Sequence, residues 1–361
     1  MKILYIGNYR DGTGWANACI NNILALDSVG VDIVPRAITF ENQQQDYPNR
    51  IKELESASAQ GCNVCIQHTL PHLYSYDSRY KNIGFLAVES SNFKDTGWQH
   101  NINLMDELWV PSHAAKISCE NSGVKIPVKV APHSLDMSEY KSSTAGNKVQ
   151  EMLSTFNFAF IGEFIERKNL QALIKAFHME FQFQEPVNLF IKTSKVELPQ
   201  MQEFVKHIKS GLKIRNRYRE EIIITGRLEK EDYISVLSQC HSFVMPSRGE
   251  AFCIPALEAM ALGIPVIYTQ ETGMDDFCVG SAVPSKATPC FGAVTTLPNL
   301  DTANSDWREI DITALRAAMR QAYQTWNSDE EKINREKVMD VAKTYDHKPI
   351  GYKMKELLND S

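Results

Sequence analysis

The sequence lacks the marks of membrane-spanning, secreted and nucleic-acid-binding proteins. No window of its 361 residues approaches 18 uninterrupted apolar residues, the length that a transmembrane helix needs. The opening MKILYIGNYR has neither an apolar signal core nor a small-residue cleavage site. The net charge of −6 disfavours nucleic acid as partner, because polyanions are bound by basic surfaces. We therefore expect a cytoplasmic protein, with peripheral membrane contact left open.

Disulfide and metal patterns are also missing. The eight cysteines lie mostly inside apolar runs, which is typical of reduced, buried thiols. The closest pair, Cys62 and Cys65, falls in an expected strand, and no second pair or histidine spacing completes a zinc site. No D-x-D motif follows a suitable strand, since Asp275 and Asp276 resemble loop residues. The sequence thus offers no metal-ligand pattern.

What the sequence does contain is two successive series of strand-like and helical segments. In the first, β-branched runs such as KILYIGNY, NVCIQH and ELWVPS alternate with helical spacing over 15–30 and 112–123. A second series starts after the polar segment 141–150, the best linker candidate, and purely helical patterns follow about residue 310. Alternating strands and helices predict parallel sheets covered on both faces. We predict an α/β protein with two Rossmann-like, doubly wound domains over 1–145 and 146–335, and a helix in 336–361 that returns to the first domain.

The most specific motif is MPSRGEAFCIPALEAMALG, which begins at Met245. A strand ends at Met245, Pro255 occupies the first turn of a helix, and Gly263 ends that helix. The unpaired N–H groups at a helix N-terminus favour a phosphate group. We expect these groups to come from Ala251, Phe252 and Cys253.

Two carboxylates flank this expected anion site. Glu250 precedes the turn and Glu258 lies one turn inside the helix. Carboxylates are poor phosphate ligands but accept hydrogen bonds from vicinal hydroxyls, which suits the sugar and the ribose on either side of a diphosphate. The alternative for Glu258 is an ordinary glutamate on a solvated helix face. The pattern favours a nucleotide-sugar site.

This segment resembles the E-x7-E signature of retaining glycosyltransferase family 4, a GT-B family with two domains that face a central cleft. The resemblance is strong from about 156 to 276 and looser over the first 140 residues. It implies that Glu250 contacts the donor sugar and Glu258 the ribose, with a nucleotide-diphosphate sugar as co-substrate and no metal or cofactor. The sequence differs in having GEAFC where the family commonly has EGFG, so Ala251 and Cys253 are expected to reshape the sugar pocket.

A second loop, FIGEFIERKN, resembles the family element G-R-L-x-x-x-K-G, whose lysine and arginine neutralise the donor diphosphate. Lys168 matches the lysine, and a cation there stabilises the leaving phosphate. The usual arginine position holds Glu163. Arg167 is a neighbouring candidate for the missing charge. The alternative is that both cations simply face water at a helix start.

The loop NYRDGTGWANA follows the first strand and contains Asp11, Gly12, Thr13 and Gly14. Its glycines permit close approach of a ligand to the backbone, although a tight structural turn has the same pattern. The loop resembles the family's N-terminal glycine loop, which faces the acceptor and the diphosphate. Asp11 and Thr13 are then candidates to bind acceptor hydroxyls.

His68 leaves an expected strand in CIQHTLPHLY, and by resemblance it matches a histidine that approaches the donor sugar better than His72 does. It is our third catalytic candidate beside Lys168 and Glu250, although a histidine at a strand end is more often a hydrogen-bonded structural residue. Glu89 also ends a strand and resembles a glutamate of related transferases, but a capping role is equally consistent.

Two further features favour structural roles. Lys206, Lys209 and Lys213 share a helical spacing that suits anionic lipid, but a solvated helix face is the better interpretation. His133 and Asp136, in APHSLD, resemble the family segment before the linker and are interpreted as structural or near a hinge.

Together these patterns predict a retaining transfer of a sugar from a nucleotide-diphosphate sugar to a glycan, a lipid-linked acceptor or a small molecule, as in polysaccharide biosynthesis. No residue stands out as a covalent nucleophile, so a leaving phosphate oxygen is expected to take the acceptor proton. A nucleotide-sugar epimerase on the same scaffold remains an alternative. So does a non-catalytic or regulatory nucleotide-sugar-binding protein, which Glu163 and GEAFC would suit. Glycosylation of DNA bases is disfavoured by the acidic charge.

Overall fold

The computed structural model describes residues 1–38, 46–140, 149–214, 219–290, 297 and 299–360. Its internal contacts divide the chain into two compact units. The expected linker falls outside the described residues from 141 to 148. The first unit comprises Met1–Met137, Thr295–Asp306 and Thr344–Ser361, and the second comprises Ser138–Val294 and Trp307–Lys343. Each unit is thus assembled from segments far apart in the sequence.

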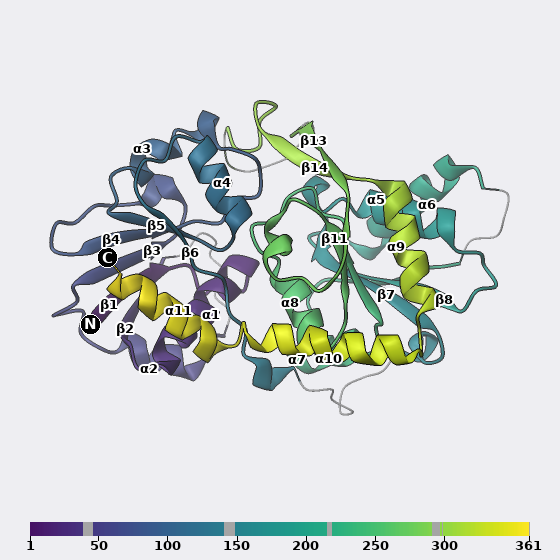
Figure 1. Cartoon of the computed structure of the whole chain (residues 1–361), viewed down its shortest axis with the longest axis horizontal. Helices are drawn as coiled ribbons and strands as arrows, with labels where there is room; N and C mark the ends of the chain where they lie inside the picture. The colour runs from purple at the N-terminus through teal and green to yellow at the C-terminus, as the bar shows by residue number, and fades with distance from the viewer. Residues whose placement is uncertain (39–45, 141–148, 215–218, 291–296, 298, 361) are drawn as a thin grey trace. The chain divides into compact units, whose positions relative to one another are not determined.

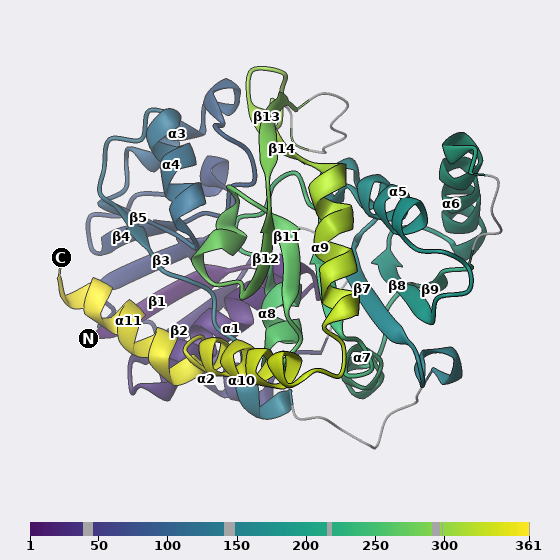
Figure 2. The same cartoon turned by 45° about the vertical axis from the view of Figure 1, so that its right-hand side comes forward.

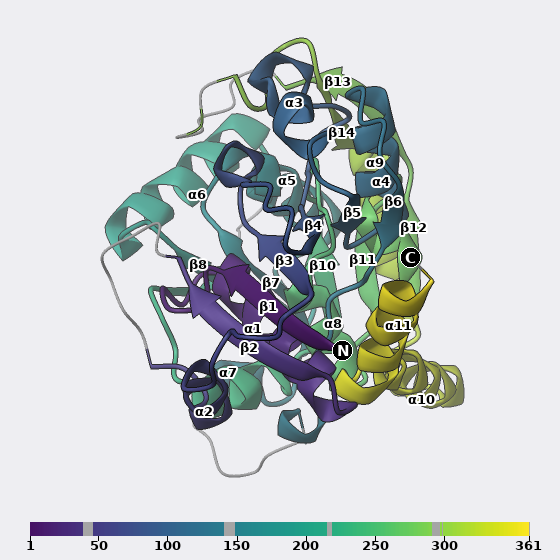
Figure 3. The same cartoon turned by 90° about the vertical axis from the view of Figure 1, so that its left-hand side faces the viewer.

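The first unit is built on six parallel strands in the order β2-β1-β3-β4-β5-β6, which can be followed in Figures 1 and 3. The strands are β1 (Lys2–Gly7), β2 (Asp32–Ala37), β3 (Val64–His68), β4 (Lys81–Phe85), β5 (Glu107–Val110) and β6 (Val128–Val130). The helices are α1 (Gly14–Ser28), α2 (Asn49–Glu55), α3 (Trp98–Ile102), α4 (His113–Asn121) and α11 (His347–Asn359), with short 3-10 turns at η1 (Pro71–Leu73) and η2 (Lys94–Thr96). A third turn, η3 (Met137–Glu139), spans the boundary to the second unit.

Helix α11 closes the first unit by packing on α1. Its apolar residues Ile350, Met354 and Leu358 are buried in the core beneath the first sheet. The two helices approach closely at Gly351, where a Cβ would lie 2.2 Å from the carbonyl oxygen of Ala25. Only glycine fits this contact, because a methyl group cannot share that space with a backbone atom. Residues of α11 therefore share one hydrophobic core with residues of β1 and α1.

The second unit is built on a sheet in the order β12-β11-β10-β7-β8-β9, again with parallel pairing. The strands are β7 (Phe156–Glu163), β8 (Val187–Ser194), β9 (Ile222–Thr225), β10 (Ser242–Met245), β11 (Val266–Thr269) and β12 (Gly280–Val283), beside a ribbon of β13 (Ser285–Pro289) and β14 (Asp306–Ile310). The helices are α5 (Leu170–Glu180), α6 (Leu198–Leu212), α7 (Lys230–Leu237), α8 (Ile254–Ala261), α9 (Ile312–Gln324) and α10 (Asp329–Lys343), with 3-10 turns at η4 (Gln150–Met152), η5 (Glu166–Lys168) and η6 (Gly273–Asp276). Helix α5 packs with α6 and α9, and α8 packs with α10 (Figure 2).

The predicted fold of two parallel, doubly wound sheets with a returning C-terminal helix is confirmed. Strands of the second sheet such as β7 read as continuous apolar runs because helices cover both faces. Gly263 ends α8 with φ of 75°, a left-handed conformation that favours glycine. In both sheets the strand order reverses once, between β1 and β3 and between β7 and β10. Ligands of open α/β sheets bind at such reversal points, outside the carboxyl ends of the strands.

Candidate functional site

The reversal point of the second sheet brings together two of the predicted loops. The turn η5 follows β7 and carries Arg167 and Lys168, while the loop after β10 carries Glu250. The backbone joins the loops directly, because the Arg248 N–H donates a hydrogen bond of 2.7 Å to the Arg167 carbonyl oxygen. The Ser247 hydroxyl donates to the same oxygen across 3.1 Å. Residues about 80 positions apart are thus fixed side by side.

A cluster of two cations and one carboxylate lies at this point. Lys168 Nζ is 2.6 Å from Glu250 Oε1, and Arg167 Nη1 is 3.3 Å from the same oxygen. Arg167 also donates to the Gly249 carbonyl oxygen at 2.5 Å. The side chain of Glu250 is 4% exposed. Burial alone would raise the pKa of Glu250, but the charges of Lys168 and Arg167 outweigh it and hold that pKa below its usual value. The cluster thus combines two basic side chains with one buried carboxylate.

The N-terminus of α8 lies in the same loop. Cys253 is its N-cap with φ of 86°, and its side chain makes no capping hydrogen bond, so the cap supplies no side-chain acceptor for the first-turn N–H groups. The three residues before α8 are buried, and the ring of Phe252 stacks on Phe277 with centroids 4.5 Å apart. Burial raises the pKa of the Cys253 thiol to about 12, so the thiol is neutral at physiological pH. The predicted backbone donors Ala251, Phe252 and Cys253 are therefore held rigidly.

Glu258 lies one turn inside α8 and is half-buried. Its Oε1 accepts a hydrogen bond of 2.6 Å from the Tyr140 hydroxyl, and its Oε2 accepts one of 2.5 Å from the Tyr233 hydroxyl. Sequence reasoning found Glu258 but missed both tyrosines. They lie 118 and 25 positions from Glu258, and no motif marks either one.

Glu163, at the family's arginine position, lies at the end of β7. Its carboxylate pairs with Lys195 Nζ at 3.0 Å, and both side chains are exposed. The position thus carries a carboxylate, and Lys195, from the segment after β8, balances its charge. Of the two expected cations, Lys168 joins the cluster at Glu250, and Arg167 joins it from the neighbouring position.

In the first unit, His68 ends β3 beside the other reversal point, but its side chain is buried with 1% exposure. Its Nδ1 shares a hydrogen bond of 2.8 Å with the Tyr5 hydroxyl. Its ring lies 4.2 Å from that of Phe85 and is stacked 5.8 Å from that of His133. Nε2 has no hydrogen-bond partner among the described residues. Burial holds the pKa of His68 well below its usual value, and that of His133 at about 3, so both rings are neutral.

In the glycine loop after β1, Asp11 and Thr13 bond to each other and to neighbouring loop residues. Asp11 Oδ1 accepts hydrogen bonds from the Thr13 N–H at 3.0 Å and the Thr13 hydroxyl at 2.7 Å, and Asn8 donates to Asp11. The Thr13 hydroxyl oxygen also caps α1 by accepting from the Ala16 N–H at 3.2 Å. Gly12 has φ of 70°, and space around a Cβ on Gly14 is open. These contacts agree with the structural-turn interpretation of Asp11 and Thr13.

The remaining candidates have local partners. The ring of His72 is stacked 6.3 Å from that of Trp98. In the lysine set on α6, Lys209 pairs with the buried Glu221 at 3.1 Å, whereas Lys206 and Lys213 are exposed. Within the described ranges, no helix is long and apolar enough to span a bilayer. The same residues contain no group of three His, Cys, Asp or Glu side chains placed to hold a metal ion.

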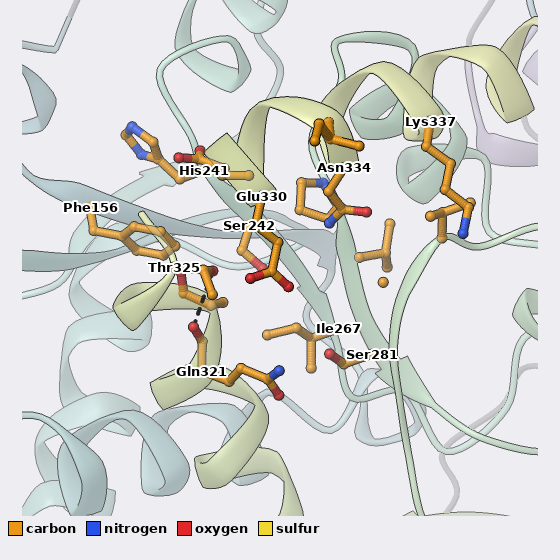
Figure 4. A pocket seen from close by; sticks show the side chains of 17 residues that line it. Phe156, His241, Ser242, Ile267, Ser281, Gln321, Thr325, Glu330, Asn334 and Lys337 are labelled. Carbon is orange, nitrogen blue, oxygen red and sulfur yellow. Dashed lines mark hydrogen bonds between the residues drawn. The ribbon is translucent and has the colours of Figure 1, made fainter. Parts of the chain in front are cut away.

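A hollow of about 620 Å³ lies at the opposite edge of the second sheet (Figure 4). Its walls come from the amino ends of β7, β10, β11 and β12 and from α9 and α10, and include Phe156, Ser242, Ile267, Gln321 and Asn334. Because ligands of parallel sheets bind at the carboxyl ends, and the charged cluster lies there, we place the candidate site at Lys168 and Glu250 and not in this hollow.

Comparison with known proteins agrees with this placement. Residues 147–279 match the family described as glycosyl transferases group 1, and residues 225–335 match family 4 glycosyltransferases in conflict systems. The serotype-specific mannosyltransferase WbdA of Escherichia coli is 33% identical over 114 residues, which cover 30% of this chain and 13% of WbdA. The uncharacterized glycosyltransferase MJ1178 of Methanocaldococcus jannaschii is 29% identical over 126 residues, which cover 34% of this chain and 32% of that protein. The chain thus spans only a small part of these curated relatives.

Solved structures extend the likeness in fold to the whole chain. The Anabaena protein Alr3699/HepE, solved in complex with UDP, superposes with a TM-score of 0.66 at 14% identity and full coverage of both chains. A glycosyltransferase from Rickettsia africae has a TM-score of 0.67 at 13% identity, with 99% of this chain and 98% of that chain covered. At these identities the likeness establishes the fold. The sequence match to glycosyl transferases group 1 thus covers residues 147–279, and the fold of the whole chain is GT-B.

Proposed function

We propose that the protein transfers a sugar from a nucleotide-diphosphate sugar to a hydroxyl group of an acceptor, with retention of the anomeric configuration. The observation that carries this proposal is the cluster of Lys168, Arg167 and Glu250 at the reversal point of the second sheet. The match of residues 147–279 to glycosyl transferases group 1 supports the reaction class, and the UDP complex of Alr3699/HepE supports a nucleotide sugar as donor. The WbdA similarity makes mannose the first donor sugar to test.

In this mechanism the second unit binds the donor. Lys168 and Arg167 neutralise the diphosphate, and the backbone N–H groups of Ala251, Phe252 and Cys253 donate to its oxygens. Glu250 and Glu258 accept hydrogen bonds from sugar and ribose hydroxyls. As the bond from the anomeric carbon to the phosphate oxygen breaks, the fixed cations stabilise the charge that develops on the leaving group.

The acceptor oxygen then bonds to the anomeric carbon, and its proton passes to a phosphate oxygen of the leaving diphosphate. No metal enters this scheme, and no protein nucleophile is required. We expect the acceptor to be a glycan or a lipid-linked saccharide. His68 is kept as a candidate at the donor sugar, and Asp11 and Thr13 as candidates for acceptor hydroxyls, although their observed partners favour structural roles.

A panel of nucleotide sugars, beginning with GDP-mannose and UDP-glucose, tests the proposal. We expect one donor to raise the melting temperature and to be hydrolysed slowly when no acceptor is supplied. Lys168→Ala should abolish that hydrolysis, while Lys332→Ala, which changes an exposed lysine on α10, should not. If no donor binds, or hydrolysis survives Lys168→Ala, the proposal fails. Isomerised nucleotide sugar among the products would indicate an epimerase.

A second candidate is a non-catalytic nucleotide-sugar-binding protein. It is favoured by Glu163, because a carboxylate paired with Lys195 occupies the position where the family has a diphosphate-binding arginine. Binding of a donor with a thermal shift equal to that of its nucleoside diphosphate, and with neither hydrolysis nor transfer, would identify this case.

A further inference from the structure

Glu258 is held by two phenols that come from different parts of the second unit. Tyr233 projects from α7, and Tyr140 follows η3 at the start of this unit. Each hydroxyl donates to a different oxygen of the same carboxylate, at 2.6 Å from Tyr140 and 2.5 Å from Tyr233. Two donors on separate backbone supports fix both the position and the plane of the carboxylate.

The two phenols lie in different surroundings. Tyr140 is 6% exposed, and Lys230 Nζ lies 5.5 Å from the centre of its ring. Lys230 also pairs with Glu139, so the segment that carries Tyr140 is anchored to α7. Burial, and then the charge of Glu258, raise the pKa of Tyr233 well above its usual value. The Tyr233 hydroxyl therefore keeps its proton near neutral pH.

The hydrogen bonds leave Glu258 with acceptor capacity. A carboxylate has about four acceptor positions, and the two phenols use one on each oxygen. The remaining position on each oxygen can accept a hydroxyl, which matches a vicinal diol. Lys192, a partly buried lysine on β8, also attracts the Glu258 charge. A glutamate held in this way loses little rotamer freedom when a ligand binds, so more of the hydrogen-bond energy contributes to affinity.

We propose that Tyr140 and Tyr233 are positioning residues for ribose recognition, because together they hold Glu258 in the geometry that accepts the two ribose hydroxyls. The inference rests on the proposed function, and it adds two residues that lie outside the motifs from which Glu258 was identified. It also predicts that discrimination between ribose and a sugar without these hydroxyls depends on the phenol hydroxyls.

The test compares GDP and UDP with their 2′,3′-dideoxy analogues by calorimetry in the wild type, Tyr140→Phe, Tyr233→Phe and the double variant. We expect the wild type to prefer the ribose form by about 10- to 100-fold or more, because one hydrogen bond to a charged acceptor already contributes a factor in this range. Each single variant should lower this ratio about threefold or more and leave the affinity for the dideoxy analogue unchanged. Glu258→Gln should lower it similarly, and Tyr323→Phe on α9 serves as the matched control.

The outcomes separate the two proposals. If the wild type binds the ribose nucleotide and the Phe variants keep the full ratio, the tyrosines do not position Glu258 for ribose, while the proposed function stands. If the Phe variants lose affinity equally for the ribose and the dideoxy nucleotides, the substitutions damage the unit in general. This outcome would also overturn the inference. If neither nucleotide binds the wild type, the proposed function falls together with this inference.

Discussion

Lys168 donates a hydrogen bond of 2.6 Å to Glu250, so the cation expected at the donor diphosphate is paired with the carboxylate expected at the donor sugar. Neither group is isolated, and each fixes the other in a buried position. A diphosphate that approaches Lys168 therefore meets an ammonium group that is already oriented and that shares its charge with a carboxylate.

Replacing Lys168 tests this arrangement. Lys168→Ala should reduce kcat/KM for transfer by about 100-fold, because a fixed charge at the leaving group stabilises the transition state more than the ground state. Lys168→Arg keeps the charge and should retain part of the activity. Steady-state kinetics with the donor found by thermal shift provides the measurement. A loss confined to KM would mean that Lys168 only binds the donor.

Glu250 should make the free energy of unfolding depend on pH in the acidic range. Its pKa in the folded protein lies below the usual value near 4.5, so the unfolded chain binds more protons as the pH falls. The contribution of Glu250 to the free energy of unfolding is thus complete above about pH 4.5 and is lost as the pH falls through the lowered pKa. In urea unfolding between pH 7 and pH 3, the free energy of unfolding should fall less steeply with pH in Glu250→Gln than in the wild type. At pH 7 that variant should be less stable by about 3 kcal/mol, since it leaves buried cations without their partner. A variant as acid-sensitive as the wild type would contradict the prediction.

The neutral pair His68 and His133 should destabilise the protein at mildly acidic pH. Both have folded pKa values below the usual 6.5, so the unfolded chain takes up protons first. Stability is therefore complete above about pH 6.5 and falls below it, by about 1.4 kcal/mol per pH unit for each histidine. His133→Gln should roughly halve this slope between pH 6.5 and pH 5 in denaturant titrations. His207, on α6 in the second unit, provides a control, and His207→Gln should leave the slope unchanged.

Adding a single methyl group at Gly351 should disturb the packing of α11 on α1. Gly351→Ala places a Cβ against the carbonyl oxygen of Ala25 and should cost about 1–3 kcal/mol through overpacking. Gly211→Ala on α6 meets open space and should stabilise by about 0.5–1 kcal/mol, because alanine favours a helix. The two melting temperatures should shift in opposite directions. If both variants melt like the wild type, the close contact at Gly351 is not required.

Much of the fold was predictable, because alternating strands and helices leave few topologies other than parallel sheets. The loops after β7 and β10 were identified for the same reason, since their motifs follow strands that end at one edge. The mutual pairing of Lys168 and Glu250 was not predictable, because a motif gives the chemistry of each residue but not the distance between them. The roles of both residues in catalysis stay predictions.

Other features depend on contacts that no local pattern encodes. His68 matched a family position, but the aromatic rings of Phe85 and His133 that bury it come from separate strands and loops. The segment Thr295–Asp306 belongs to the first unit, where the side chains of Thr302 and Asn304 donate hydrogen bonds to the Asp95 carboxylate. Polar side chains 200 positions apart give no periodic signal, so this return of the chain could not be foreseen.

The packing of α11 on α1 has a consequence for synthesis in the cell. The hydrophobic surface of α1 emerges from the ribosome early, but the residues that cover it, including Ile350 and Met354, are translated more than 300 positions later. During that interval the N-terminal half exposes an apolar face that is a target for chaperones and a risk for aggregation. Nascent fragments that stop before α11 should therefore be more sensitive to protease than the finished chain.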